Sequence, residues 1–294
     1  MGVACGLSAD DLDSQNVEMT MERREILAVI TFSVTTLAGC GGGGYSSPPP
    51  PVMNQAVGGI WNAQVTANGV TANVAILSAD DGRLFSVAQN QNNGCLALVT
   101  GNVTATGSSI SGATKFALAT YSFTSGTTTG CVYPDGSNSG TGTFTGTVVQ
   151  RSTLTITSAG TTSLGNALPS SPTFTATFNT LYNRASSLAT IGGNWIGPSG
   201  VVMNINSNGV IFAQDPTDGC VINGQVSIIN ASYNAYSLSA TYSNCAGAAS
   251  ALNGLTATGL GAVDDTVVPN ALLVGYSVVL GTGETIIVAA SATR

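Results

Sequence analysis

The feature that most constrains the fold of this chain is a set of motifs that occurs twice in the same order. Each set holds a Gly-x-Trp tripeptide, a glycine-led motif ending in Phe, a Gly-Cys pair, an Ala-Thr-Tyr-Ser tetrapeptide and one further cysteine. The first set runs from Gly58 to Cys131 and the second from Gly192 to Cys245. Such ordered recurrence indicates an internal duplication. We therefore predict β module 1 over residues 58–181, a linker over 182–191 and β module 2 over 192–294.

Both halves show the alternation of apolar and polar residues that is typical of half-buried strands. Residues 70–76 read VTANVAI, and residues 236–242 read YSLSATY. Turn signals such as Asp81-Gly82 and Asn208-Gly209 separate these runs. We expect eight strands in the second half and a similar number in the first. Those of the second half lie near 195, 201–206, 210–214, 221–229, 236–243, 255–263, 272–280 and 285–289.

These strands predict an all-β protein made of two tandem eight-stranded antiparallel meander modules. Short turns between successive strands favour small up-and-down barrels, because closure removes exposed sheet edges. A two-sheet sandwich in each half is the first alternative. One larger barrel formed by both halves together is the second.

Four cysteines occupy matching places in the two halves. An even number of cysteines in an exported chain indicates disulfides, and four cysteines allow three pairings. The duplication favours Cys95–Cys131 and Cys220–Cys245, since each module then has its own bridge. A redox or metal site is the alternative, but the chain has neither a CxxC motif nor a histidine to support one.

The N-terminal region predicts export and lipidation. An uncharged apolar run, 26–37, follows two arginines and has the length of a signal-peptide core. Leu37-Ala38-Gly39-Cys40 then resembles the lipobox of bacterial, in particular proteobacterial, outer-membrane lipoproteins. That resemblance implies a signal peptide over 21–39, acylation of Cys40 and, since Gly41 follows, the outer membrane as destination. Residues 40–57 form a Gly/Ser/Pro tether, and residues 1–20 are interpreted as a non-native or mis-called extension.

The tripeptides ending in Trp61 and Trp195 resemble the Gly-x-Trp motif of lipocalin and related calycin barrels. There the tryptophan closes one end of an eight-stranded barrel, often packed against a basic residue. The whole chain also resembles uncharacterised β-rich proteobacterial lipoproteins that pair two modules. We expect Trp61, Trp195, Phe85 and Phe212 in the barrel cores, with contact to a small apolar ligand as the alternative.

Composition weighs against catalysis and against nucleic-acid binding. Only 7% of the residues are charged, the formal net charge is −7, and there is no histidine. The chain therefore lacks the commonest general base and the commonest metal ligand, and it cannot form a basic patch. Its only lysine, Lys115, is the one candidate for a Ser–Lys pair and lies in a strand-like run. We predict no catalytic residue, no metal and no cofactor.

Six of the eight acidic residues of the predicted modules gather in three clusters that could suggest calcium or glycosidase sites: 80–81, 215–218 and 264–265. Because Asp is common in turns, we assign them to turn structure. The predicted function is that of a non-enzymatic envelope lipoprotein, an interaction or structural protein held at the outer membrane through Cys40. The alternative is a carrier of a small apolar ligand inside a barrel, since eight strands can enclose one.

Overall fold

The computed structural model describes residues 53–67, 69–120, 131–168, 173–197 and 200–294. The predicted lipidation site Cys40, the signal peptide, the N-terminal extension and most of the tether lie outside these ranges. Within them, no helix is long and apolar enough to cross a membrane.

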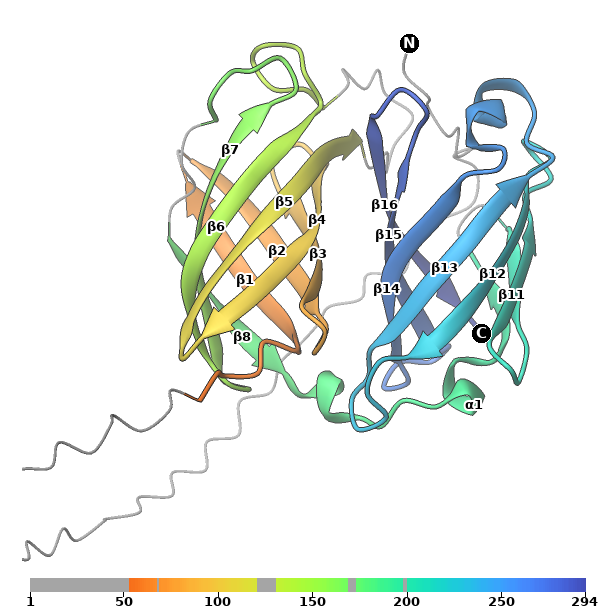
Figure 1. Cartoon of the computed structure of the whole chain (residues 1–294), viewed down its shortest axis with the longest axis horizontal. Helices are drawn as coiled ribbons and strands as arrows, with labels where there is room; N and C mark the ends of the chain where they lie inside the picture. The colour runs from red at the N-terminus through yellow and green to blue at the C-terminus, as the bar shows by residue number, and fades with distance from the viewer. Residues whose placement is uncertain (1–52, 68, 121–130, 169–172, 198–199) are drawn as a thin grey trace, which may run out of the picture.

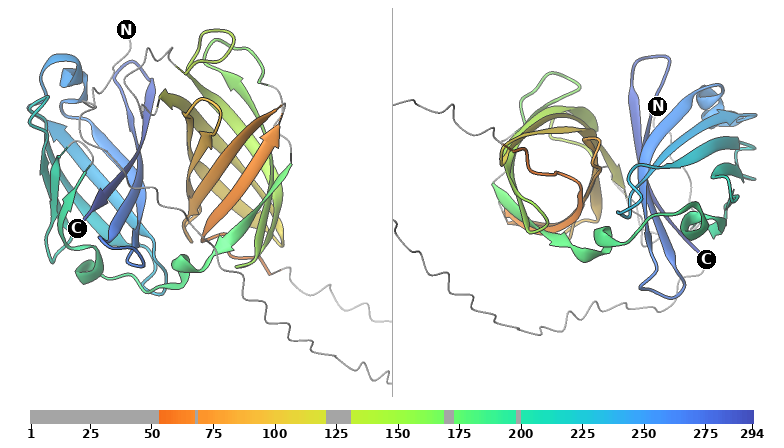
Figure 2. Two further views of the ribbon diagram at one scale, coloured as in Figure 1. Left: turned by 180° about the vertical axis from the view of Figure 1, so that it is seen from behind. Right: turned by 60° about the horizontal axis from the view of Figure 1, so that its bottom comes forward.

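The first eight strands close into one antiparallel barrel in simple chain order, with β8 pairing back to β1. Figure 2 shows this ring of strands from one end. The strands are β1 (Gly59–Ala67), β2 (Val70–Ser78), β3 (Arg83–Asn90), β4 (Cys95–Thr106), β5 (Ser109–Thr120), β6 (Ser139–Val149), β7 (Thr153–Thr162) and β8 (Phe174–Asn179).

The second barrel repeats this order and lies beside the first (Figure 1). Pairing of β16 with β9 closes it. Its strands are β9 (Gly193–Ile196), β10 (Val202–Ile205), β11 (Val210–Gln214), β12 (Val221–Ile228), β13 (Tyr236–Ser243), β14 (Thr256–Asp264), β15 (Ala271–Val279) and β16 (Thr285–Thr293). The prediction of two eight-stranded β modules is confirmed. Each module is a closed barrel, so neither the two-sheet sandwich nor the single larger barrel is correct.

Alternation along the strands sends one apolar set into each barrel, as the period of two requires. Leu84 on β3 and Ile211 on β11, which occupy matching positions in the duplication, are both buried in their own barrel cores. Trp61 and Trp195 are both fully buried. The first core also contains Val74, Ile76, Val103, Ile110, Phe144, Val148, Leu154, Ile156 and Ala176.

The two tryptophans satisfy their indole N–H groups differently. Trp61 donates to Ser78 Oγ over 3.0 Å, and Phe178 packs edge-on against its ring. Trp195 donates to the Ile191 carbonyl over 2.7 Å, and the guanidinium of Arg294 lies 4.5 Å from its ring centroid. A basic residue over the tryptophan, the arrangement that the calycin resemblance implies, is thus present in the second module.

Each barrel carries its own disulfide, in the pairing that the duplication predicts. Cys95 at the start of β4 is bonded to Cys131, 36 residues later. Cys220, just before β12, is bonded to Cys245, 25 residues later. In the second barrel a short 3-10 helix, η2 (Gly247–Leu252), follows the bridge and packs Ala249 beside it.

The connection between the barrels is a 3-10 turn, η1 (Thr180–Asn183), followed by one helical turn, α1 (Leu188–Ile191). Tyr182 on η1 is 1% exposed and stacks on Tyr233 of the second module, with ring centroids 5.1 Å apart. Its hydroxyl donates to Asp80 of the first module. Asp80 also accepts a hydrogen bond from Asn230 of the second module over 2.7 Å. The connection therefore helps to fix the two barrels to each other.

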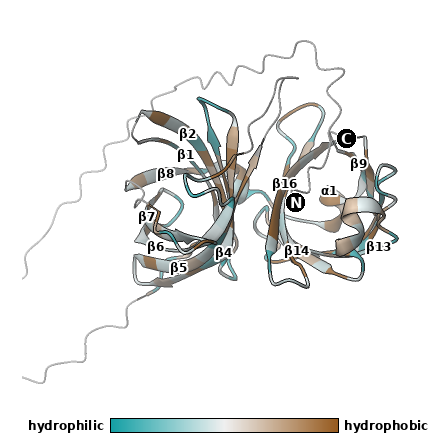
Figure 3. Cartoon of the chain, turned by 90° about the horizontal axis from the view of Figure 1, so that it is seen from above, coloured by the Kyte–Doolittle hydropathy of each residue, from teal (hydrophilic) through white to brown (hydrophobic). Residues whose placement is uncertain are grey.

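An apolar seam joins the barrels directly. Viewed from above, the barrels lie side by side, with β4 of the first beside β16 of the second (Figure 3), and β3 contacts β14 and β15. Phe85 and Leu98 from the first barrel pack with Leu260 and Ile287 from the second, all buried. Burial of apolar surface on both sides stabilises this arrangement. The two modules consequently form one body with a defined junction.

Candidate functional site between the two modules

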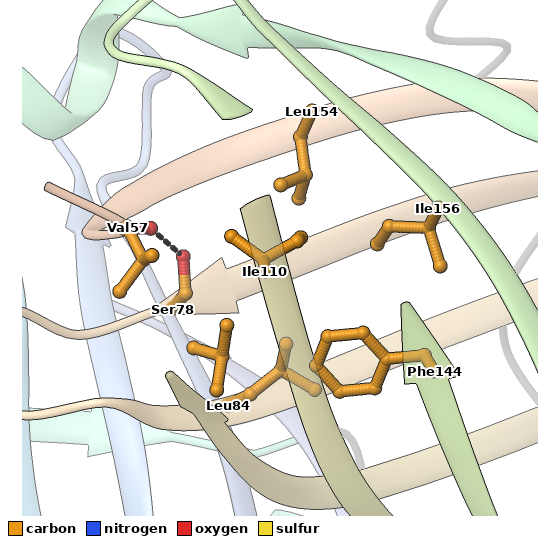
Figure 4. A pocket seen from close by; sticks show the side chains of 8 residues that line it. Val57, Ser78, Leu84, Ile110, Phe144, Leu154 and Ile156 are labelled. Carbon is orange, nitrogen blue, oxygen red and sulfur yellow. Dashed lines mark hydrogen bonds between the residues drawn. The ribbon is translucent and has the colours of Figure 1, made fainter. Parts of the chain in front are cut away.

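The interior of the first barrel holds a very small cavity beside Ser78, the hydrogen-bond partner of Trp61. A cavity of about 10 Å³ lies among Leu84, Ile110, Phe144 and their neighbours (Figure 4). At its edge, Ser78 Oγ donates to the Val57 carbonyl over 2.5 Å. A volume of this size holds about one water molecule at most. This cavity is therefore too small for an organic ligand.

A much larger space lies outside the barrels, in a cleft where they meet. The inter-module cleft has a volume of about 650 Å³, within the range of small-molecule sites. One wall consists of residues from β3, β4, β5 and β6 of the first barrel. The other consists of residues from β14, β15 and β16 of the second. Neither barrel forms this cleft alone.

The walls of the inter-module cleft are rich in hydroxyl groups. Thr100 and Thr141 lie on the first wall, and Thr258, Ser277 and Thr285 lie on the second. Phe85 and Leu260 supply apolar surface where the walls meet. The charged residues among the described lining are Arg83 and Lys115, so this lining carries positive charge and no carboxylate.

Arg83 is engaged in a network that ties the modules together. Its Nη2 lies 2.6 Å from Asp81 Oδ2, and its Nη1 donates to Ser237 Oγ of the second barrel over 2.7 Å. Partial burial opposes ionisation of Asp81, but the hydrogen bonds and the positive charge of Arg83 outweigh it and lower the pKa of Asp81. The charge of Arg83 is thereby balanced locally.

Lys115 has a different environment. It is exposed on β5, and its Nζ donates to Thr285 Oγ1 across the cleft over 3.0 Å. Within the described ranges, every other cation has an acidic, aromatic or carbonyl partner. These partners are Asp81 for Arg83, Tyr233 for Arg151, Asp265 for Arg184, and Trp195 with two backbone carbonyls for Arg294. Among the described residues, the hydrogen-bond partner of the Lys115 ammonium group is therefore a neutral hydroxyl.

The predicted core aromatics fall into two groups. Trp61 and Trp195 lie in the barrel cores, whereas the placement of Phe85 and Phe212 in those cores is wrong. Both phenylalanines follow an inward residue on their strand, so alternation turns them to the outer face. The second barrel covers Phe85, which is 7% exposed, while Phe212 is 49% exposed.

One aspartate of each acidic cluster behaves as a turn residue. Asp81, Asp215 and Asp264 each accept a hydrogen bond from the backbone N–H two residues further on. This is the local bonding that favours Asp in turns. In the part of the chain that the structure describes, no three acidic or cysteine side chains converge as a metal site.

Two features of this site escape prediction from the sequence. Asp80 bridges the two modules by accepting hydrogen bonds from Tyr182 and Asn230. These partners lie 102 and 150 positions further along the chain. The inter-module cleft likewise depends on how the barrels dock, and no local motif encodes docking. One feature of the sequence pointed to the cleft: the chain has a single lysine, and that lysine lies in a predicted strand.

Comparison with known proteins adds no assignment: no protein-family model matches the chain, and a search of curated proteins finds no match.

Proposed function

We propose that this protein is a non-enzymatic envelope lipoprotein that acts by binding through the joined surface of its two modules. The observation that carries this proposal is the inter-module cleft of about 650 Å³, formed by both barrels and lined by polar side chains. The LAGC motif supports anchoring of the chain to the outer membrane through Cys40. The tether after Cys40 would let the two-barrel body stand away from the bilayer.

The lining of the cleft supports binding in preference to catalysis. Arg83 is held in an ion pair with Asp81, which leaves Lys115 as the titratable group that can act there. A lone ammonium beside a threonine hydroxyl has no carboxylate or imidazole to form an acid–base pair among the described lining residues.

The alternative role, carriage of a small apolar ligand inside a barrel, has little support from the first barrel. Its cavity near Trp61 has a volume of only about 10 Å³. In the second barrel, the inward side chains Trp195, Tyr236 and Leu272 are fully buried in a packed cluster.

The anchor can be tested by labelling cells with radioactive palmitate and separating the membranes. Wild-type protein should carry label and sediment with the outer membrane, and Cys40→Ser should lose the label, because the thiol is the acyl acceptor. Cys5→Ser is the matched control, since it removes a cysteine from the predicted extension and should label as wild type. Label retained in Cys40→Ser, or lost in Cys5→Ser, would contradict the lipid-anchor assignment.

A further inference from the structure

We infer that the inter-module cleft binds an acidic saccharide, with Lys115 receiving the anionic group and the hydroxyl-bearing walls receiving the sugar hydroxyls. This inference rests on the proposed binding role and is independent of the lipid anchor. The shared chemistry is an anionic group on a polyhydroxyl scaffold, which both uronic acids and sugar phosphates provide.

The charge of Lys115 is the first argument. An ammonium group has three N–H donors, and Thr285 Oγ1 takes one of them over 3.0 Å. Both described ion pairs, Arg83–Asp81 and Arg184–Asp265, involve other cations. Among the described residues, two donors and the positive charge of Lys115 therefore remain for a ligand. Charge-assisted hydrogen bonds to an anion are stronger than neutral ones.

The register of the first wall supplies the second argument. Lys115 on β5 is paired with Thr100 on β4 and with Thr141 on β6. All three belong to the lining of the cleft, and adjacent strands lie about 4.8 Å apart. Lys115 thus has a hydroxyl-bearing residue beside it on each neighbouring strand, at a spacing of one strand.

The second barrel provides a matching wall. Thr258 on β14 is directly paired with Ser277 on β15, and both line the cleft. Each hydroxyl can donate one hydrogen bond and accept others, as each sugar hydroxyl can. The walls can therefore satisfy several ligand hydroxyls at once, whichever way each is oriented.

Charge selects against other small ligands and against long polyanions. The ammonium group of Lys115 repels a cationic ligand. A long polyanion would extend beyond the cleft and meet a chain that carries eight acidic and five basic residues from Cys40 onward. A short saccharide with one or a few anionic groups satisfies both limits.

The test is isothermal titration calorimetry on the full chain purified in mild detergent. The probes are trigalacturonate, maltotriose and maltose 1-phosphate, so that a carboxylate, a neutral and a phosphate saccharide are compared. We expect at least one anionic probe to bind, and maltotriose to bind about tenfold more weakly or not at all. If one anionic probe binds more tightly than the other, the difference shows whether the cleft prefers a carboxylate or a phosphate. Either preference supports the inference.

Three variants localise the binding. Lys115→Gln removes the ammonium group and should reduce the affinity for the anionic probe about tenfold. Arg184→Gln, the matched control, removes one positive charge outside the cleft and should bind as wild type. Thr258→Trp places a bulky ring at an exposed lining position and should block binding. A cooperative thermal unfolding transition, followed by far-ultraviolet circular dichroism, checks that each variant is folded.

The inference is overturned if neither anionic probe binds, if folded Lys115→Gln binds as tightly as wild type, or if folded Thr258→Trp leaves binding intact. Palmitate labelling of the same wild-type preparation separates the two proposals. Labelled protein that binds no anionic saccharide leaves the envelope-lipoprotein proposal standing and removes only the cleft assignment. Unlabelled protein that binds removes the anchor and keeps the cleft.

Discussion

The ring of Phe85 from the first barrel lies directly on the backbone of Gly275 from the second. A Cβ added to Gly275 would be 2.1 Å from Cδ1 of Phe85, closer than two non-bonded carbon atoms can approach. This contact lies in the apolar seam, beside Leu98 and Leu260. The absence of a side chain at position 275 is what lets the two barrels approach closely enough to bury the ring.

Gly275→Ala should weaken the junction between the modules. Because the new methyl group overlaps the Phe85 ring, the barrels must shift apart or the ring must move, at a cost of about 1–3 kcal/mol in unfolding free energy. The measurement is chemical denaturation, together with the radius of gyration from small-angle X-ray scattering, which should increase. Gly281→Ala is the control, since no atom lies within 4 Å of a Cβ there. Equal stability of the two variants would contradict the prediction.

Phe85→Ala and Phe212→Ala should differ sharply, although the duplication places them at equivalent positions. Phe85 is buried in the seam, so its removal should lower the unfolding free energy by about 3 kcal/mol. Phe212 is 49% exposed, so its removal should change stability by less than about 0.5 kcal/mol. Urea denaturation of both variants provides the comparison. Similar losses for the two would show that Phe212 is also covered.

Arg294→Ala should destabilise the second module. The Arg294 side chain lies over the Trp195 ring and donates to the Thr190 carbonyl over 2.7 Å. Losing this cation–π contact from an exposed side chain should cost about 1 kcal/mol. Trp195 fluorescence should also change, because the charge beside its ring disappears.

The control for Arg294→Ala is Arg184→Ala, which breaks an exposed ion pair with Asp265. Exposed pairs contribute roughly 0–1 kcal/mol, and neither tryptophan contacts this pair, so the fluorescence should be unchanged. A fluorescence change in Arg184→Ala equal to that in Arg294→Ala would contradict the assigned contact.

Asp135 should contribute stability that disappears in acid. Hydrogen bonds from Ser137, Thr162 and Asn166 hold the pKa of this carboxyl well below its usual range. A lowered pKa in the folded state means that the unfolded chain takes up the proton first as the pH falls. The contribution is therefore fully present above the unfolded value of about 3.9 and is lost progressively below it.

The measurement is the melting temperature of Asp135→Asn from pH 7 to pH 3. The variant should melt at a lower temperature than wild type at pH 7, and the gap should narrow as the pH falls below about 4. Asp218→Asn is the control, because the Asp218 side chain makes no hydrogen bond to the described residues and should melt as wild type. A gap that widens in acid would show that Asp135 acts in the opposite sense.

The sequence by itself determined the internal architecture of each module. Alternation is a local property, since each residue on a strand points to the face opposite its neighbour. It therefore located all eight strands of the second module to within a few residues. The repeated cysteines likewise indicated Cys95–Cys131 and Cys220–Cys245, because each bridge stays within one repeat.

The alternation of apolar and polar residues along a strand could not predict what covers the outer face of a barrel. Phe85 and Phe212 have the same place in the repeat, yet one is buried and the other is half exposed. Only the docking of the second barrel against β3 and β4 makes this difference, and docking depends on shape at distant positions such as Gly275.

The candidate site, too, was predicted from the sequence only in part. The sequence singled out Lys115 as the only lysine and placed it in a strand, but it gave no partner for it. The tertiary structure alone decided that Lys115 faces Thr285, 170 residues later, across a cleft that two barrels form together. Strand formation follows from neighbouring residues, whereas a site between modules exists only once two separately closed surfaces have packed.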